Sequence, residues 1–105
     1  MPNELLTQEK AAYWATSLSS LECRVICLLA HRVWNYRQLA EETGGTYAEL
    51  SRVGRHLQYL KFAWMRTAYL MSEFNGRALC LSPRGEQVRL AIEALERRRR
   101  KRKTD

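Results

Sequence analysis

Gly44 and Gly45 interrupt the segment YRQLAEETGGTYAELSRVGRHLQYL, which has a helical pattern on both sides of them. Glycine readily adopts the left-handed conformation that ends many helices, so this pair predicts the end of a short helix. Thr46 followed three residues later by Glu49 is a capping-box pattern, and it predicts a second helix over about residues 47–61. This part of the chain is therefore expected to fold as a short helix, a tight turn and a longer helix.

Close packing of two such helices requires a small residue in the first helix and apolar anchors in the second. Ala40 is the small residue, and Leu50 and Val53 are apolar at helical spacing. Counted from Tyr36, the small residue is fifth, the turn glycine ninth and the anchors fifteenth and eighteenth. This spacing resembles the helix-turn-helix pattern over residues 36–55.

The longer helix is expected to have an apolar side and an opposite side that is polar and basic. At about 100° per residue, Leu50, Val53 and Leu57 cluster on one side. Arg can donate two hydrogen bonds to guanine, Gln pairs with adenine, and Ser and Tyr bind phosphate. A solvent-exposed polar face of a core helix is the alternative interpretation. The expected DNA contacts in this region are Thr46, Tyr47, Ser51, Arg52, Arg55, Gln58 and Tyr59.

The net charge of +7 is unevenly distributed along the chain. Residues 1–50 hold four Lys or Arg and six Glu, whereas residues 51–89 hold seven Lys or Arg and two Glu. The positive half thus begins inside the longer helix, and such asymmetry suits an anionic polymer as partner. A solvated basic face is again the alternative.

The last nine residues, RRRRKRKTD, hold seven Lys or Arg and one Asp. Because like charges repel, this end is expected to fray from the preceding helix and to add salt-dependent affinity for DNA phosphates. RNA, an anionic protein partner and, in a eukaryote, a nuclear-localisation role are the alternatives. The expected phosphate contacts are Arg97, Arg98, Arg99, Arg100, Lys101, Arg102 and Lys103.

The periodicity changes after the longer helix, in MRTAYLMSEFNGRALCLS. Asn75-Gly76 is the preferred pair for a two-residue type I′ hairpin turn, so a β-hairpin is predicted there. Ser82 and Pro83 then suit the start of a final helix. The hairpin turn predicts three cross-strand pairs, Phe74 with Arg77, Ser72 with Leu79, and Leu70 with Leu81.

The run GRALCLSPRGEQV is similar to the end of the wing and the start of the last helix in MarR-like and related bacterial regulators. Leu81 and Ser82 match a Leu-Thr/Ser pair of that pattern, Gly85 matches a glycine one turn later, and Arg77 matches a basic wing residue. The resemblance covers about residues 19–90, although the wing is short and lacks the usual Asp-x-Arg segment. It implies a transcriptional regulator, usually dimeric, with the longer helix in the major groove. Arg77 and Arg66 would contact the flanking minor groove or backbone.

The predicted fold class is mainly α with a small β-hairpin wing, a winged helix-turn-helix with extra N- and C-terminal helices. With 105 residues, 46% of them hydrophobic, the chain is expected to bury one modest core. The expected parts are a single domain over 1–96, with its helix-turn-helix at about 36–61, its wing at about 66–82 and a C-terminal helix from 83, and a basic tail over 97–105.

The first and last helices are candidates for a homodimer interface. A first helix is expected within TQEKAAYWATSL, and a second begins at Ser19, which forms a capping-box pattern with Glu22. Val88, Ile92 and Leu95 form an apolar stripe on the last helix. These segments would either join two chains or close the core of one chain.

Cys23, Cys27 and His31 recur every four residues along one side of the second helix, a spacing that would suit part of a metal or redox sensor. That helix is mostly apolar and contains no Cys-x-x-Cys pair, so buried packing is the favoured interpretation. Cys80 is the third cysteine, and an odd number of cysteines without a secretion signal favours reduced thiols. The expected location is therefore the cytoplasm, with the chain on the nucleoid when it is bound to DNA. In a eukaryote the expected location is the nucleus.

No phosphate loop, nucleophile elbow or paired-His metal motif is present, so neither an enzyme nor a cofactor is predicted. No apolar run is long enough for a membrane helix, and no effector can be named. The sequence therefore predicts sequence-specific binding of double-stranded DNA by a small dimeric regulator, a repressor rather than an activator. A winged-helix protein-interaction module and an RNA-binding protein led by the basic tail are the alternatives.

Overall fold

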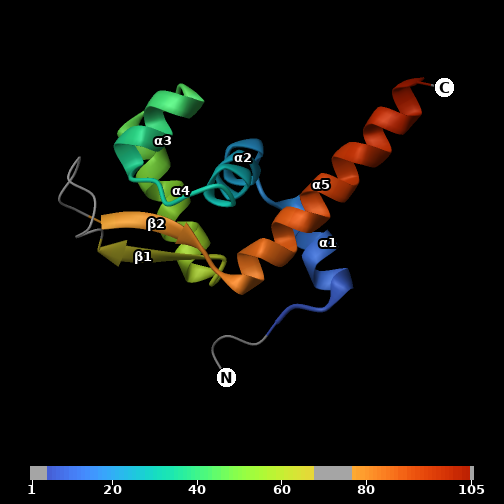
Figure 1. Cartoon of the computed structure of the whole chain (residues 1–105), viewed down its shortest axis with the longest axis horizontal. Helices are drawn as coiled ribbons and strands as arrows, with labels where there is room; N and C mark the ends of the chain where they lie inside the picture. Colours follow the sequence, from blue (N-terminus) through green and yellow to red (C-terminus); the bar gives the residue numbers. More distant parts are fainter. Residues whose placement is uncertain (1–4, 68–76, 105) are drawn as a thin grey trace.

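The computed structural model describes residues 5–67 and 77–104 of the chain. Figure 1 shows α3, α4 and the two strands at one end of the long axis, while α5 runs from the strands toward the other end beside α1. The elements are α1 (Gln8–Ser17), α2 (Ser20–Leu29), α3 (Tyr36–Thr43), α4 (Tyr47–Tyr59), β1 (Ala63–Thr67), β2 (Arg77–Leu81) and α5 (Pro83–Thr104). This order agrees with the predicted winged-helix arrangement.

Side-chain caps define the starts of the first four helices. The predicted boxes are both confirmed, since Ser19 caps α2 with Glu22 and Thr46 caps α4 with Glu49. A third box, formed by Asn35 with Gln38 at α3, was not predicted. Each box satisfies two backbone donors that would otherwise lack partners.

Two left-handed residues end α3 and α4. Gly44 has φ 79° and donates its N–H to the carbonyl of Ala40 at 2.9 Å, as the turn pattern predicts. Lys61 has φ 67° and follows α4 in a Schellman motif, in which the Phe62 N–H bonds to the Leu57 carbonyl at 2.9 Å. The chain thereby leaves α4 at a defined angle and enters β1.

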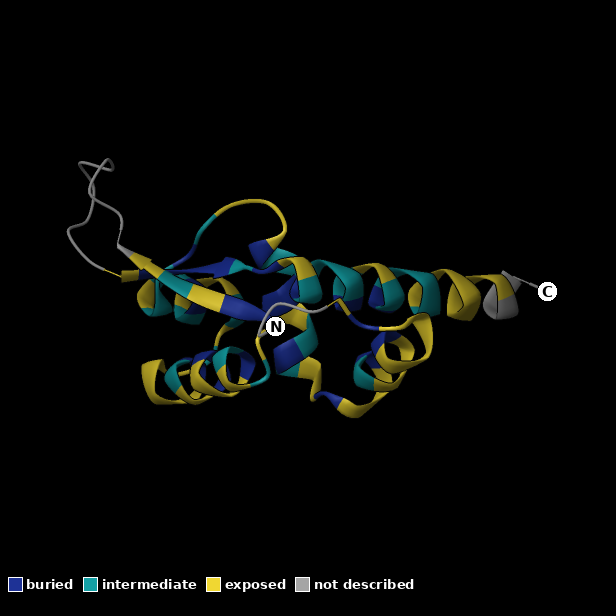
Figure 2. Ribbon diagram, turned by 90° about the horizontal axis from the view of Figure 1, so that it is seen from below, coloured by how far each residue is buried: buried dark blue, intermediate teal, exposed yellow. Residues whose placement is uncertain are grey.

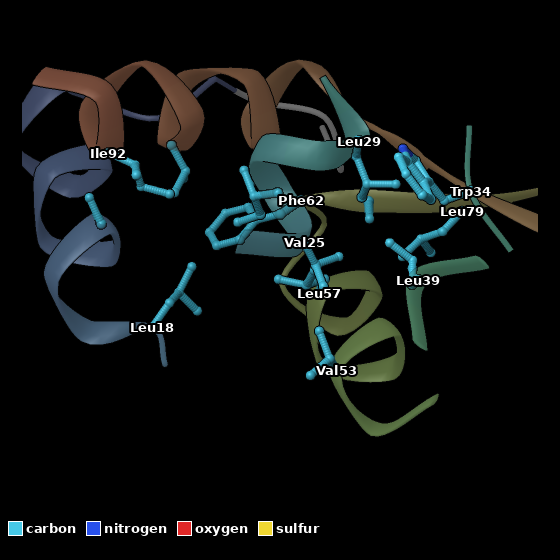
Figure 3. Packing of buried hydrophobic residues seen from close by; sticks show 14 of the residues in the cluster. Leu18, Val25, Leu29, Trp34, Leu39, Val53, Leu57, Phe62, Leu79 and Ile92 are labelled. Carbon is cyan, nitrogen blue, oxygen red and sulfur yellow. The ribbon is translucent and has the colours of Figure 1, made fainter. Parts of the chain in front are cut away.

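The core is centred on α2, which packs against α3, α4, β2 and α5. Figure 3 shows Val25 and Leu29 of α2 facing side chains from several other elements, with the ring of Phe62 close by. Trp14 of α1 meets the Phe62 ring edge-on, with ring centroids 5.7 Å apart. The helix-turn-helix and the first helix therefore share one hydrophobic cluster.

The strands pair in a register that corrects the predicted hairpin. Leu79 lies opposite Met65 and Leu81 opposite Ala63, whereas Arg77 lies opposite Thr67. The expected partners of these residues, and the Asn75-Gly76 turn itself, lie outside the described residues. Leu79 also exchanges backbone hydrogen bonds with Trp34 at 2.7 and 3.0 Å, so non-local contacts determine its position.

The first turn of α5 packs directly on the corner between α4 and β1. Ser82 donates its hydroxyl to the Lys61 carbonyl at 2.6 Å, and the Ser82 hydroxyl accepts the Gly85 N–H at 3.0 Å. A Cβ on Gly85 would lie 2.0 Å from the Phe62 carbonyl oxygen. Glycine is therefore required here by close backbone approach, which accounts for the predicted Leu-Ser-x-x-Gly match.

The basic C-terminal segment continues α5 as a single helix to Thr104, which corrects the expectation that it frays. Arg and Lys are good helix formers, and positive charge near a helix C-terminus interacts favourably with the helix dipole. These two effects offset the repulsion between like charges. Within the described part of the chain, no helix is both long and apolar enough to cross a membrane.

Candidate nucleic-acid interface

The crossing of α3 and α4 orients the candidate interface. Leu50, Val53 and Leu57 of α4 are buried, as the helical pattern predicts. Gly54 is buried too, and a Cβ there would lie 2.4–2.7 Å from atoms of the Tyr36 side chain. The predicted small residue, Ala40, is half-buried and packs against the core, and Gly54 is a second close contact between the two helices, which sequence reasoning missed. A glycine inside a helix lowers the stability of that helix. The presence of Gly54 within a predicted helix was therefore the sequence signal that could have identified this contact.

Two polar contacts hold the helix-turn-helix against α2. Glu22 accepts the Ser19 N–H through one oxygen and contacts Nδ1 of His56 on α4 through the other. Arg24 donates to the Glu42 carbonyl near the end of α3 at 3.0 Å. These contacts join residues far apart in the sequence, so helical spacing did not reveal them.

The pKa of Glu22 reflects this arrangement. Burial, the largest single influence, raises the pKa of the carboxyl group, but hydrogen bonds from Ser19 and His56 together outweigh burial and hold the pKa below its usual range. Glu22 is therefore ionised at neutral pH and is positioned to attract His56.

The predicted contact residues of α4 divide into two groups. Tyr47 and Tyr59 are exposed, at 62% and 81% of their surface, and Arg52 and Arg55 between them are exposed as well. The Tyr47 ring packs edge-on against the Tyr36 ring, with the ring centroids 5.7 Å apart. These four side chains form what we call the α4 face.

The other three predicted residues are less available. The Thr46 hydroxyl accepts the Glu49 N–H as part of the helix cap. Ser51 is half-buried. Gln58 is half-buried too, and its amide donates to the Gly54 carbonyl at 3.1 Å and to the Tyr36 hydroxyl at 3.5 Å. Gln58 thus stabilises the α3–α4 crossing in the free chain, and its predicted base contact would require those bonds to break.

The wing carries its two arginines on opposite faces. Arg66 lies opposite Ala78, and Arg77 lies opposite Thr67, so the alternation of side chains along a strand separates them. Both are exposed. The structure therefore brings them to the same end of the ribbon while pointing them apart.

The basic end of α5 does not join the α4 face. Arg97, Arg98, Arg99, Arg100 and Lys101 are exposed, and Figure 2 shows this part of α5 at the end of the molecule opposite the strands. The side chains of Arg102 and Lys103 lie outside the described set. The candidate contacts thus form two separate basic regions.

The proposed dimer helices pack closely on each other within one chain. Val88 and Ile92 are buried in the core of the chain itself, as the monomer alternative expects, while Leu95 is half-buried. Leu90 is 50% exposed and lines a cleft of about 560 Å³ with Ala12 of α1. Leu5 and Tyr13 are exposed large hydrophobic residues as well.

The thiols are placed for packing. Cys23 donates to the Ala15 carbonyl at 3.7 Å, and burial, reinforced by nearby glutamates, raises the pKa of Cys23 and Cys27. Burial likewise raises the pKa of Cys80. His31 is exposed. Within residues 5–67 and 77–104, no three His, Cys, Asp or Glu side chains gather as a metal site would require.

No family model and no curated protein matches the chain. Among solved structures, it is similar to SP03579, a MarR family transcription regulator, with a TM-score of 0.70 and 19% identity over 88% of this chain and 60% of the other. Lactococcus lactis ZitR, a zinc-responsive MarR family member, gives a TM-score of 0.66 and 17% identity over 77% of this chain and 55% of the other. A mutant of S. aureus MepR gives a TM-score of 0.70 and 11% identity over 92% of this chain and 72% of the other.

The chain spans little more than half the length of ZitR and 60% of SP03579. The similarity extends over 77–92% of this chain, whose elements are the helix-turn-helix, the paired strands and the helices on either side of them. The chain thus has the winged helix-turn-helix fold of the MarR-family transcription regulators.

Proposed function

We propose that this chain binds double-stranded DNA through the α4 face and the wing, and acts as a dimeric regulator of transcription. The observation that carries the proposal is the exposure of Arg52 and Arg55 between Tyr47 and Tyr59, on the second helix of a helix-turn-helix. In this motif the second helix lies in the major groove.

The chemistry of the α4 face suits that groove. Arg52 and Arg55 are three residues apart, so they project from the same side of the helix. Each guanidinium can donate two hydrogen bonds to guanine, and the phenol groups of Tyr47 and Tyr59 can donate to phosphate on either side. The arginines would read the sequence, and the tyrosines would set the register.

The wing would contact the duplex beside the major-groove site. Because Arg66 and Arg77 project from opposite faces of the ribbon, a ribbon inserted in the minor groove would direct one arginine toward each phosphate wall. This arrangement would position the chain without adding much sequence discrimination.

A second copy of the chain is the proposed partner at the α1–α5 cleft. The cleft is lined largely by apolar side chains, including exposed Leu90. A two-fold pair would present two α4 helices to two half-sites of one operator. Repression would then follow from occupation of that operator.

Selection of bound duplexes from a random pool is the direct test of sequence-specific binding. A palindromic consensus is the expected result, because two α4 helices related by a two-fold axis read inverted half-sites. Recovery of duplexes with no common sequence would contradict the proposal.

Replacement of Arg55 by Ala tests the α4 face. We expect the affinity for the selected duplex to fall by about 1–3 kcal/mol, with an unchanged free energy of unfolding, since the side chain is exposed. Fluorescence anisotropy at fixed salt measures the affinity. Lys10→Ala is the matched control because it removes one exposed positive charge from α1. Equal losses in the two variants would show that charge alone, without α4 contacts, accounts for binding.

A protein-interaction module is the second candidate function, and the exposure of Tyr59 at 81% favours it. Exposed aromatic residues are enriched where proteins dock on one another. If Tyr47→Ala or Tyr59→Ala abolishes binding of a protein partner, while the unmodified chain has no affinity for duplexes, this function replaces DNA reading.

A further inference from the structure

The far end of α5 is a continuous basic helix that the α4 face does not use. Every residue from 97 to 103 is Lys or Arg. The acidic residues that flank this run are Glu96 before it and Asp105 after it. The backbone is helical throughout this stretch. The side chains from Arg97 to Lys101 are all exposed in the single chain, and Arg98 also lines the α1–α5 cleft where the second copy is proposed to bind. A helix with basic residues at consecutive positions presents positive charge on every side.

The linear charge density of this helix is comparable to that of a nucleic-acid duplex, and a docked helix would turn part of its charges toward one duplex. An α-helix rises about 1.5 Å per residue, so seven consecutive basic residues place one positive charge about every 1.5 Å along its axis. Double-stranded DNA carries one negative charge about every 1.7 Å along its axis. Glu93 and Glu96 are the acidic residues that most closely precede this stretch, and the seven basic residues outnumber them. The chemistry therefore favours a dense linear polyanion.

The position of this helix end separates it from the α4 face. Arg97 lies 14 residues beyond Pro83, where α5 begins. At about 1.5 Å per residue, that distance is about 21 Å along the helix axis. Figures 1 and 2 agree that α5 carries the basic end away from the strands and from α4, along a molecule 48 Å long.

We propose that residues 97–103 of α5 form a second DNA-binding element, which holds a separate duplex segment by its phosphates while α4 occupies the first. The chain would then bridge two duplex segments. This inference rests on the proposed function for the first duplex, because the α4 face must hold one segment for the basic helix to recruit another.

The contacts of this second element would be with the backbone alone. A helix that offers positive charge on every side has no preferred face with which to read base edges, so it would bind any sequence. Its affinity would fall steeply with salt as condensed counterions return to the DNA. Because the segment is already helical, binding would order little additional backbone.

A two-duplex capture assay tests the inference with the full chain. Duplex A, which carries the selected site, is fixed to beads, and a fluorescent duplex B without the site is supplied in solution. The neutral-helix variant replaces seven residues by Gln, a good helix former that removes charge and keeps the helix. Its substitutions are Arg97→Gln, Arg98→Gln, Arg99→Gln, Arg100→Gln, Lys101→Gln, Arg102→Gln and Lys103→Gln.

The unmodified chain should retain duplex B on beads that carry duplex A. The neutral-helix variant should keep its footprint on duplex A but retain at least about tenfold less duplex B at low salt. Circular dichroism of the variant checks that the helix persists. Equal retention of duplex B by the two proteins would overturn the inference, as would a shortened footprint of the variant on duplex A.

Two additional experiments distinguish this inference from the proposed function of the α4 face and from RNA binding. In the variant Arg52→Ala with Arg55→Ala, preference for duplex A should disappear while sequence-independent binding through α5 persists. If the preference persists instead, the proposed function of the α4 face fails, and the neutral-helix variant still reports on the tail. Structured RNA at the same phosphate concentration should compete with duplex B no better than duplex DNA does; strongly preferential displacement by RNA would overturn the assignment to DNA.

Discussion

The two basic regions of this molecule lie at opposite ends and are built in different ways. On the α4 face, partly buried contacts hold the helix that carries the arginines, among them Tyr36 against Gly54 and Glu22 against His56. At the end of α5, the side chains from Arg97 to Lys101 are exposed along a continuous helix. Positioned charge can discriminate between bases, whereas charge without a packed background can only recognise the phosphate backbone. This difference predicts a sequence-specific DNA contact at the α4 face and a sequence-independent contact at the end of α5.

Gly85 lies in the first turn of α5, against the corner between α4 and β1, and its replacement by Ala should have the largest effect. The new Cβ would lie 2.0 Å from the backbone oxygen of Phe62, and backbone cannot move away as a flexible side chain can. We expect the free energy of unfolding to fall by about 3 kcal/mol, because overpacking of this kind shifts the surrounding backbone. Urea denaturation followed by circular dichroism measures the change.

Gly45→Ala is the matched control for Gly85→Ala. A Cβ on Gly45 would come closest to the end of the Leu50 side chain, at 2.8 Å, and that side chain can rotate. The control should lose much less stability than Gly85→Ala. Similar losses in the two variants would show that close backbone approach at Gly85 is not the reason for glycine there.

Gly54→Ala should disturb the α4 face while leaving the end of α5 unchanged. Alanine gains about 1 kcal/mol of helix propensity over glycine. Its Cβ, however, would displace the Tyr36 ring and with it the support of Tyr47. We expect a net loss of about 1–2 kcal/mol in unfolding free energy and weaker binding to the selected duplex, because overpacking exceeds the propensity gain. Retention of a second duplex by the α5 end should not change.

The double variant of Gly54→Ala with Tyr36→Ala identifies the cause. If the clash with the ring is responsible, removal of the ring makes the alanine at position 54 nearly neutral or stabilising, so the two effects do not add. Additive losses would indicate that Gly54 matters for a reason other than its contact with Tyr36.

Local signals in the sequence predicted the elements and the exposed basic positions well. The capping boxes at Ser19 and Thr46, and the turn at Gly44, depend on residues within one helical turn of each other, so a short pattern contains them. The exposure of Arg52 and Arg55 followed from helical periodicity in the same way. The structure confirms all of these features.

Features that depend on distant contacts could not be read in this way. Leu79 pairs with Met65 of β1 and also exchanges backbone hydrogen bonds with Trp34, 45 positions away, and a local turn signal contains neither contact. Gln58 turns toward Tyr36 on the preceding helix, so its helical position alone suggested a base contact that the free chain does not favour. The run of like charges over residues 97–103 likewise led to an overestimate of repulsion in α5, because helix propensity and the helix dipole act the other way.

Glu22→Gln should have the smallest effect, because it removes one charge from the anchor of α4 and keeps the shape of the side chain. Gln also completes a capping box, so the bond from the Ser19 N–H can remain while the attraction to His56 is lost. We expect the free energy of unfolding at pH 7 to fall by about 1 kcal/mol, as is typical of a single hydrogen bond to a charged group that is partly exposed.

The pH dependence of this pair distinguishes loss of charge from loss of packing. Since the folded chain holds the pKa of Glu22 below its usual range, the carboxylate stabilises the fold fully above its unfolded pKa of about 4.3. That contribution declines as the pH falls through the lower pKa of the folded state. Urea denaturation at pH 7 and pH 3 should therefore show the unmodified chain losing its advantage over Glu22→Gln at the lower pH. A difference that stays constant between the two pH values would mean that the carboxylate charge does not anchor α4, and the positioning of the α4 face would then depend on Gly54 and Tyr36 alone.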